Sequence, residues 1–205
     1  MKRGKASQKE VKIILLGNSS VGKTSIINRY IKNTFNMNIT SSLGSQNFEK
    51  VIQKGKEAYK LIIWDTTGQE KYNSLTNLFI NKSNIVILTY SIDNIYSFIG
   101  LDYWYNCVEE KLEKNKYILA VVGNKSDLIN DKEEEVNEEE GKEYAKEKNA
   151  FFKLISAKED PNGINDLFET LLDELINSNI GFFEDIKDGD SLNKTNGENK
   201  EKKCC

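Results

Sequence analysis

The chain has 205 residues, of which 38 % are hydrophobic and 30 % charged, and its formal net charge at pH 7 is −3. This length and balance predict one globular domain, and the slightly negative charge argues against nucleic acid as a partner. The sequence has no histidine, which excludes triads with an imidazole base and histidine-ligated zinc. The three cysteines, Cys107, Cys204 and Cys205, suggest neither a disulfide framework nor a zinc site.

Short apolar runs alternate with longer stretches at helical spacing, which is typical of βαβ units. The pattern predicts a doubly wound α/β domain at residues 9–178, with a mostly parallel six-stranded sheet and helices on both faces. Residues 1–8 are expected to form a flexible N-terminus. The expected strands are 11–16, 48–52, 60–64, 85–90, 117–123 and 151–154. The expected helices are 22–32 and four more that begin near Gln69, Ile95, Glu138 and Ile164.

The composition changes at Asn179 to mainly Gly, Asn, Asp and Lys, which predicts a disordered tail at residues 179–205. Residues 178–203 contain five Lys against six Asp and Glu, so the tail has no polybasic patch for anionic lipids. The Glu-rich stretch 131–140 is interpreted as a solvated loop that leads into a charged helix, in preference to an acidic partner site.

Residues 17–24 are Gly-Asn-Ser-Ser-Val-Gly-Lys-Thr, a complete GxxxxGK[ST] loop between an expected strand and an expected helix. Gly22 allows the backbone to approach phosphates, and the N–H groups at the helix start form an anion nest. Lys23 is expected to reach the β- and γ-phosphates, and the Thr24 hydroxyl to ligate Mg²⁺. The nucleotide is predicted to contact Ser19, Ser20, Val21, Gly22, Lys23, Thr24 and Ser25.

The segment Asn124-Lys125-Ser126-Asp127 directly follows an expected strand, at the sheet edge where open α/β folds bind ligands. The Asp127 carboxylate can accept from N1–H and the exocyclic amine of guanine, and adenine does not present these donors in that arrangement. Taken alone, such a segment is more often an ordinary loop. Together with the phosphate loop and with residues 156–158 (Ser-Ala-Lys) after the next strand, it predicts a guanine nucleotide, GTP or GDP.

Residues 65–69, Asp-Thr-Thr-Gly-Gln, begin at the end of a third expected strand. Asp65 can sit near the metal, and Gly68 gives a backbone that can swing onto the γ-phosphate. Gln69 is the candidate for orienting the attacking water, because phosphoryl transfer depends mainly on positioning and charge stabilisation. A solvent-exposed loop glutamine is the alternative, and the offset of four residues from Asp65 argues against it.

These separated motifs resemble the Ras-like small GTPases, which have a P-loop NTPase-type fold, over residues 9–178. The run KLIIWDTTGQE at 60–70 is similar to the pattern KLQIWDTAGQE of the Rab branch, and residues 71–75 are similar to its continuation RYxSL. The resemblance implies that Phe35 lies edge-on against guanine and that Lys125 covers the base. It also implies that Ser42 binds Mg²⁺ only beside a γ-phosphate, and that the N–H of Ala157, between Ser156 and Lys158, donates to the guanine carbonyl.

The departures from the Rab pattern concentrate at the switch segments. Ser42 and Thr67 stand where Thr and Ala are usual, and residues 42–48 are one residue longer than the pattern TIGxxF. Residues 79–83 match the pattern YYRGA poorly. The extra hydroxyl of Thr67 is expected to perturb hydrolysis slightly.

The resemblance implies a slow GTPase switch for vesicle traffic that works with an exchange factor, a GTPase-activating protein and effectors. Cys204 and Cys205 resemble a double geranylgeranylation signal, and two lipid chains give stable anchoring where one does not. The same resemblance implies a prenyl-tail chaperone as a partner and a location on the cytoplasmic face of an intracellular membrane, with cycling through the cytosol. A faint similarity at residues 71–75 suggests that this membrane is endosomal. One alternative is a nucleotide-dependent effector-binding module that hardly hydrolyses GTP. An ATPase or kinase is disfavoured by Asn124 and Asp127.

Overall fold

The computed structural model describes residues 8–36, 46–66, 79–129, 135–178 and 180, together with the backbone of 184–185. The helix predicted near Gln69, residues 1–7 of the predicted flexible N-terminus at 1–8 and most of the predicted disordered tail lie outside these ranges, whereas Gln8 is already part of the first strand. Among the described residues, no helix is both long and apolar enough to cross a bilayer.

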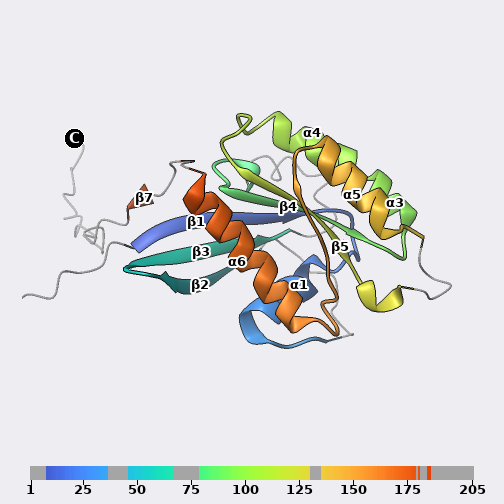
Figure 1. The fold of residues 1–205 in the computed structure, drawn as a ribbon, viewed down its shortest axis with the longest axis horizontal. Helices are drawn as coiled ribbons and strands as arrows, with labels where there is room; N and C mark the ends of the chain where they lie inside the picture. The colour runs from blue at the N-terminus through green and yellow to red at the C-terminus, as the bar shows by residue number, and fades with distance from the viewer. Residues whose placement is uncertain are drawn as a thin grey trace, which may run out of the picture.

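One sheet forms the centre of the molecule, with strand order β2-β3-β1-β4-β5-β6 (Figure 1). Its strands are β1 (Gln8–Leu16), β2 (Gln46–Lys54), β3 (Glu57–Asp65), β4 (Ile85–Ser91), β5 (Ile118–Asn124) and β6 (Phe151–Leu154). Among these six strands, neighbours pair in parallel except β2 and β3, which form an antiparallel hairpin. The prediction of a mostly parallel six-stranded sheet is therefore confirmed.

A seventh, two-residue strand, β7 (Glu184–Asp185), pairs antiparallel with β1 at Lys9 and Glu10. It lies beside the start of β1, where β4 does not reach, because β4 pairs with β1 only from Ile13 onward (Figure 1). The composition of the tail gives no signal for this strand.

The central strands are buried on both faces, as expected for a parallel sheet covered by helices. All seven residues of β4 and all seven of β5 are buried. The hairpin strand β2 lies at the edge of the sheet and alternates between exposed and partly buried positions. The sheet is thus built around β1, β4 and β5, whose carboxyl ends meet at one edge.

Of the helices in the described ranges, two cover one face of the sheet and three cover the other (Figure 1). The first pair is α1 (Lys23–Lys32) and α6 (Pro161–Asn177), and the second group is α3 (Ile95–Ile99), α4 (Leu101–Glu109) and α5 (Glu138–Glu147). Phe168 of α6 stacks on Tyr30 of α1, with ring centroids 3.9 Å apart. On the opposite face, the fully buried Trp104 and Val108 of α4 pack on Ile14 and other β1, β4 and β5 side chains. The prediction of helices on both faces is confirmed, and the helix predicted near Gln69 stays a prediction.

Helix α6 begins at Pro161, three residues before the predicted start at Ile164. The difference has a local cause, because Asp160 caps the helix by accepting a hydrogen bond from the Gly163 N–H at 2.8 Å. Pro161 occupies the first helical turn, where its missing N–H costs nothing. Helix α5 begins at Glu138 as predicted, with a capping box between Asn137 and Glu140.

Candidate functional site

The loop between β1 and α1 is shaped by two glycines at positions where a side chain cannot fit. Gly17 has φ +148°, and a Cβ there would lie 2.0 Å from the carbonyl oxygen of Thr89. Gly22 has φ +96°, and a Cβ there would lie 2.2 Å from Asn124 Nδ2. In this loop Ser19 and Ser20 are exposed, Val21 is buried, and Ser25 is half-buried in the first turn of α1. The chain therefore passes close to β4 and β5 before it enters the helix.

Lys23 is the first residue of α1, and its side chain is folded back over this loop. It is only 4 % exposed, and its Nζ donates to the carbonyl oxygens of Gly17 at 2.7 Å and Asn18 at 3.0 Å. A buried ammonium beside the N-terminus of a helix combines a full positive charge with a partial one. This arrangement suits an anionic group such as a phosphate.

Thr24 lies against the end of β3. Its Oγ1 donates to Asp65 Oδ2 at 2.8 Å, and Asp65 is 1 % exposed. A hydroxyl and a carboxylate are hard oxygen donors of the kind that Mg²⁺ prefers, and Mg²⁺ bound with a nucleotide needs few protein ligands. Among the described residues, no group of three or more His, Cys, Asp or Glu could form a separate metal cage. The pair of Thr24 and Asp65 fits a Mg²⁺ ion held together with phosphates.

Asn124 joins the phosphate loop to the loop that follows β6. Its side chain is buried, and Nδ2 donates to the carbonyl oxygen of Val21 at 2.8 Å. Its Oδ1 accepts from the Ala157 N–H at 3.1 Å. This N–H is the one that the family resemblance directs to the guanine carbonyl, and here it donates to Asn124. One amide thus brings together three segments that the sequence places far apart.

Asp127 follows in the short 3₁₀ helix Ser126–Leu128, and its side chain is 8 % exposed. Ser156 Oγ donates to Asp127 Oδ1 at 2.6 Å, and Lys158 Nζ lies 3.5 Å from Oδ2. These contacts hold the carboxylate in one orientation at the carboxyl edge of the sheet. The structure therefore brings Asn124, Asp127 and residues 156–158 together in one cluster.

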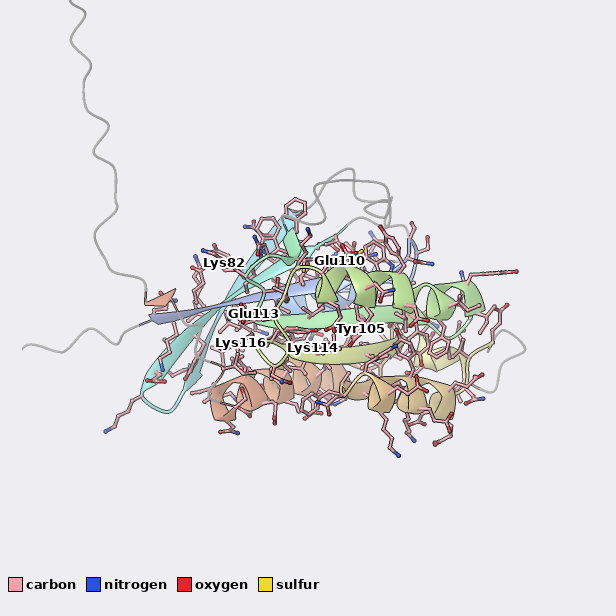
Figure 2. The ribbon with its side chains drawn as sticks, turned by 90° about the horizontal axis from the view of Figure 1, so that it is seen from above. Lys82, Tyr105, Glu110, Glu113, Lys114 and Lys116 are labelled. Atoms are coloured by element: carbon pink, nitrogen blue, oxygen red, sulfur yellow. The ribbon has the colours of Figure 1, made fainter. Side chains whose placement is uncertain are left out.

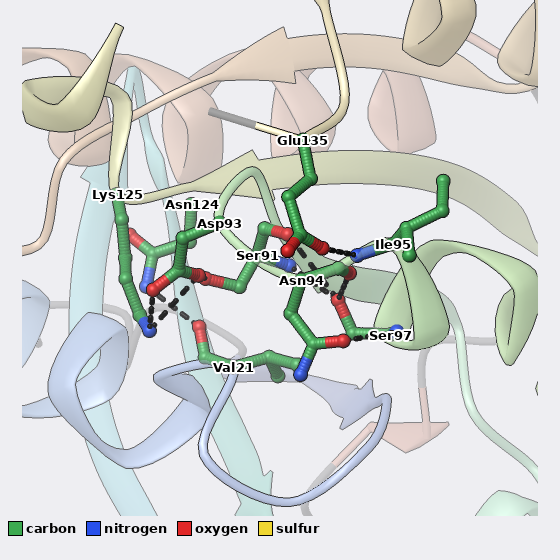
Figure 3. Close-up of polar contacts among 9 residues, drawn as sticks. All are labelled: Val21, Ser91, Asp93, Asn94, Ile95, Ser97, Asn124, Lys125 and Glu135. Carbon is green, nitrogen blue, oxygen red and sulfur yellow. Dashed lines mark hydrogen bonds and ion pairs between the residues drawn. The ribbon is translucent and has the colours of Figure 1, made fainter. Parts of the chain in front are cut away.

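Lys125 has a partner that the sequence analysis missed. Its Nζ lies 2.8 Å and 3.1 Å from the two oxygens of Asp93, and Ser91 Oγ also donates to this carboxylate (Figure 3). Burial alone would raise the pKa of Asp93, but the hydrogen bonds from Lys125 and Ser91 and the Lys125 charge together lower it below its ordinary value. Asp93 follows β4 at the same edge of the sheet at which Lys125 follows β5, which is the signal that could have identified it.

The loop that carries Asp93 is itself fixed by hydrogen bonds at the start of α3. Asn94 Oδ1 accepts from the Ser97 N–H at 3.1 Å, and Glu135 Oε2 accepts from the Ile95 N–H at 2.7 Å (Figure 3). Ser97 Oγ in turn accepts from the Ser91 N–H at 3.0 Å. Asp93 is consequently presented to Lys125 from a well-supported turn.

Arg29 was also missed as a supporting residue. From α1, its Nε donates to the Ala157 carbonyl oxygen and its Nη2 to that of Lys158, both at 2.9 Å. Its guanidinium carbon lies 6.0 Å from the ring centroid of Phe35, which is half-buried against the α1–α6 core. Arg29 thereby connects the segment with Phe35 to the loop at 156–158.

Ser42, Thr67, Gly68, Gln69, Cys204 and Cys205 lie outside the described residues. The roles predicted for them stay predictions.

The chain is similar in sequence to proteins of one large family. A family model described as the Ras family matches residues 12–177, which include all three loops of the site. Ras-related protein Rab-17 of Homo sapiens is 36 % identical over 204 residues, 99 % of this chain and 94 % of the relative. Ras-related protein Rab-22A of Homo sapiens is 36 % identical over 160 residues, and Ras-related protein Rab-31 of Homo sapiens is 35 % identical over 161 residues. Each of these two alignments covers 78 % of this chain and 80 % of the relative.

Proposed function

The chain belongs to the Ras family, in its Rab branch, and we propose that it acts as a GTPase switch through the cluster of loops joined by Asn124. As a member of this family it binds and hydrolyses GTP and regulates vesicle traffic. The observation that carries the residue assignments is the double contact of the Asn124 amide with Val21 and Ala157. It supports a single site in which a phosphate loop and a base-binding loop lie side by side.

Guanine selectivity rests on Asp127 in this proposal. The N1–H and the exocyclic amine of guanine would donate to a carboxylate that Ser156 and Lys158 already hold in place. A base that lacks those donors would leave the carboxylate oxygens without hydrogen bonds in a poorly solvated position, and such a loss discriminates strongly between ligands. Lys125 would cover the base, supported from the side by Asp93.

Thr24 and Asp65 would hold Mg²⁺ together with the nucleotide, and Ser42 would join them only in the GTP state. The bound ion would neutralise negative charge on the phosphates during transfer. Lys23 would place its ammonium on the same phosphates. Together these residues would bind GTP tightly and align its γ-phosphate. Gln69 would orient the water that attacks it.

Intrinsic hydrolysis is expected to be slow because the described part of the chain offers no arginine for the transition state. The sequence contains only Arg3 and Arg29, and Arg29 is engaged with the carbonyl oxygens of Ala157 and Lys158. An accelerating protein would supply the missing charge, as arginine fingers do in this class of reaction. GTP would order the segments around Ser42 and Gly68, effectors would bind that state, and an exchange factor would restore it.

The membrane part of the proposal depends on Cys204 and Cys205. Lipid chains on both thiols would anchor the protein stably, and a prenyl-tail chaperone would carry it through the cytosol. An endosomal membrane is the location we infer from residues 71–75, on the cytoplasmic face. Replacing both cysteines with serine should move a tagged protein from the membrane fraction to the soluble fraction. Retention on membranes would refute the lipid assignment alone.

The family membership favours a hydrolase over a binding module with very weak turnover. A single-turnover assay of phosphate release from bound GTP, run with wild type and Gln69→Leu, tests the residue that would carry the chemistry. We expect the wild type to hydrolyse GTP slowly and the variant to be slower still, with unchanged GDP affinity. Equal rates in the two proteins would remove Gln69 from the mechanism.

A further inference from the structure

A second concave site lies at the opposite edge of the sheet from the nucleotide site. A cavity of about 700 Å³ opens beside the amino-terminal half of β1, between the turn before β4 and the loop before β5. Four lysines line it, Lys12, Lys82, Lys111 and Lys116, together with Glu10 and Glu113. We call it the lysine cavity. Figure 2 shows Lys82, Glu113 and Lys116 gathered at this end of the molecule.

The framework of the lysine cavity is fixed by Asn84. The Lys12 N–H donates to Asn84 Oδ1 at 2.8 Å, and the Asn84 N–H donates to the Lys12 carbonyl oxygen at 2.9 Å. The Ile118 N–H donates to the Asn84 carbonyl oxygen at 2.9 Å, which attaches β5 to the same point. The cavity is therefore formed by elements that the core already holds, and its volume is in the range of small-molecule sites.

The charge in the lysine cavity favours an anion. Its four lysines outnumber its two glutamates. Lys12 is held at the cavity wall by a hydrogen bond from Nζ to the Asn81 carbonyl oxygen at 2.7 Å. Burial lowers the pKa of Lys12, and the nearby positive charge of Lys82 lowers it further, so these two cations repel each other. An anion between them would relieve this repulsion. Lys114 is close in sequence but is paired with Glu109 at 3.0 Å and does not line the cavity.

The position of the cavity relates it to the membrane end of the chain. Glu10, which lines the cavity, pairs with Glu184 of β7. Twenty residues follow Asp185 and end in Cys204 and Cys205, so the tail starts from the edge of the sheet that carries the lysine cavity. The tail itself has five Lys against six Asp and Glu. The tail therefore has no excess of positive charge, whereas the lysine cavity has one.

We propose that the lysine cavity binds clustered phosphate monoester groups, carried by a phosphorylated lipid headgroup or by a free phosphorylated ring compound. Several ammonium groups around one cavity suit ligands with more than one phosphate, because each phosphate can accept from two or more donors. Lipid headgroups would bind when the domain faces the bilayer. The lysine cavity shares no residue with the nucleotide site, and its placement beside a membrane rests on the proposed lipidation of Cys204 and Cys205.

The test uses the full unlipidated chain with GDP and Mg²⁺ in every sample, so that the nucleotide site is occupied. Two probes are compared: phosphatidylcholine vesicles that contain a phosphatidylinositol bisphosphate, and soluble inositol hexakisphosphate. The variant Lys111→Gln/Lys116→Gln removes two lining charges from an exposed loop. Lys142→Gln/Lys146→Gln, on the exposed side of α5, makes the same charge change away from the cavity.

We expect the cavity variant to bind the probes at least about tenfold more weakly than the wild type does, and the α5 variant to bind them like the wild type. Binding to vesicles that the soluble probe displaces would identify the lipid headgroup as the source. Binding of the soluble probe alone would support the site with a free ligand. Absence of binding by both probes, or equal loss in the two variants, would overturn the proposal. GDP affinity, measured in the same samples, reports separately on the proposed nucleotide site.

Discussion

Lys125 Nζ makes a two-oxygen ion pair with the Asp93 carboxylate, at 2.8 Å and 3.1 Å, at the edge of the sheet where β4 and β5 end (Figure 3). The side chains are 34 % and 22 % exposed, so solvent screens the pair only in part. The pair fixes the direction of the lysine that is proposed to lie over the base. Through the proposed role of Lys125, it would give the loop after β4 a part in nucleotide binding.

The first prediction concerns the strength of this support. Asp93→Asn keeps the shape of the side chain and removes its charge, so Lys125 should be held less firmly. We expect GDP to dissociate several-fold faster, which corresponds to about 1 kcal/mol. Release of a fluorescent GDP analogue measures the rate. Asp102→Asn, which removes an ion pair with Lys148 directly after α5, should leave the rate unchanged. Equal rates in wild type and Asp93→Asn would contradict the assignment.

The same pair predicts a dependence of stability on pH. The pKa of Asp93 is lower in the folded protein than its ordinary value. Its contribution to the free energy of unfolding is therefore fully present above the ordinary pKa of about 3.9, and it is lost as the pH falls through the lower folded value. Denaturation of wild type and Asp93→Asn, in one nucleotide state, should show a stability difference at pH 6 that shrinks below about pH 4. A difference that stays constant with pH would show that the ion pair contributes nothing.

Gly22 offers a test of the packing between the phosphate loop and β5. A Cβ at Gly22 would lie 2.2 Å from Asn124 Nδ2, whereas Gly55, also at positive φ, has no atom within 4 Å of such a Cβ. Both alanine substitutions incur backbone strain of about 1–2 kcal/mol. Gly22→Ala should in addition displace Asn124 and reduce GDP affinity at least tenfold. Gly55→Ala should lose stability and keep its affinity, which calorimetric titration can establish.

Thr24 tests the metal assignment. Thr24→Ala removes a hydroxyl that donates to Asp65 and would ligate Mg²⁺, whereas Thr24→Ser keeps it. In the wild type, chelation of Mg²⁺ should accelerate GDP release. We expect this acceleration to survive in the serine variant and to be largely lost in the alanine variant, which should release GDP rapidly with or without Mg²⁺. An alanine variant that responds to chelation like the wild type would exclude Thr24 as a ligand.

The sequence predicted those parts of the site whose signal is local. The phosphate loop is defined by residue types at fixed spacing between a strand and a helix. Asn124 and Asp127 likewise come directly after a buried apolar run, the predicted strand 117–123. The six strands were predicted because buried apolar runs alternate with helical spacing. Strand β6 has the predicted bounds, whereas β1 begins at Gln8 rather than Val11, because ladder pairing with β3 continues past the apolar run.

The parts that were missed depend on contacts between distant segments. Asp93 and Lys125 are separated by 32 positions, and Arg29 and Ala157 by 128, so no window of the sequence contains either pair. An arginine within a helix also has an ordinary interpretation as a solvent-exposed side chain. The start of α6 was misplaced for a different reason, since apolar spacing indicates the buried face of a helix but not the capping residue, here Asp160, that precedes it.

Competition between GDP and ADP for the full chain in Mg²⁺ tests the central claim most directly. Asp127, held by Ser156 and Lys158, is proposed to select guanine, so the wild type should bind GDP at least 10⁴-fold more tightly than ADP, about the discrimination of a site built around buried hydrogen bonds. Asp127→Ala should lose most of this preference while keeping its fold. Comparable affinities of the wild type for GDP and ADP would contradict the assignment of a guanine nucleotide switch.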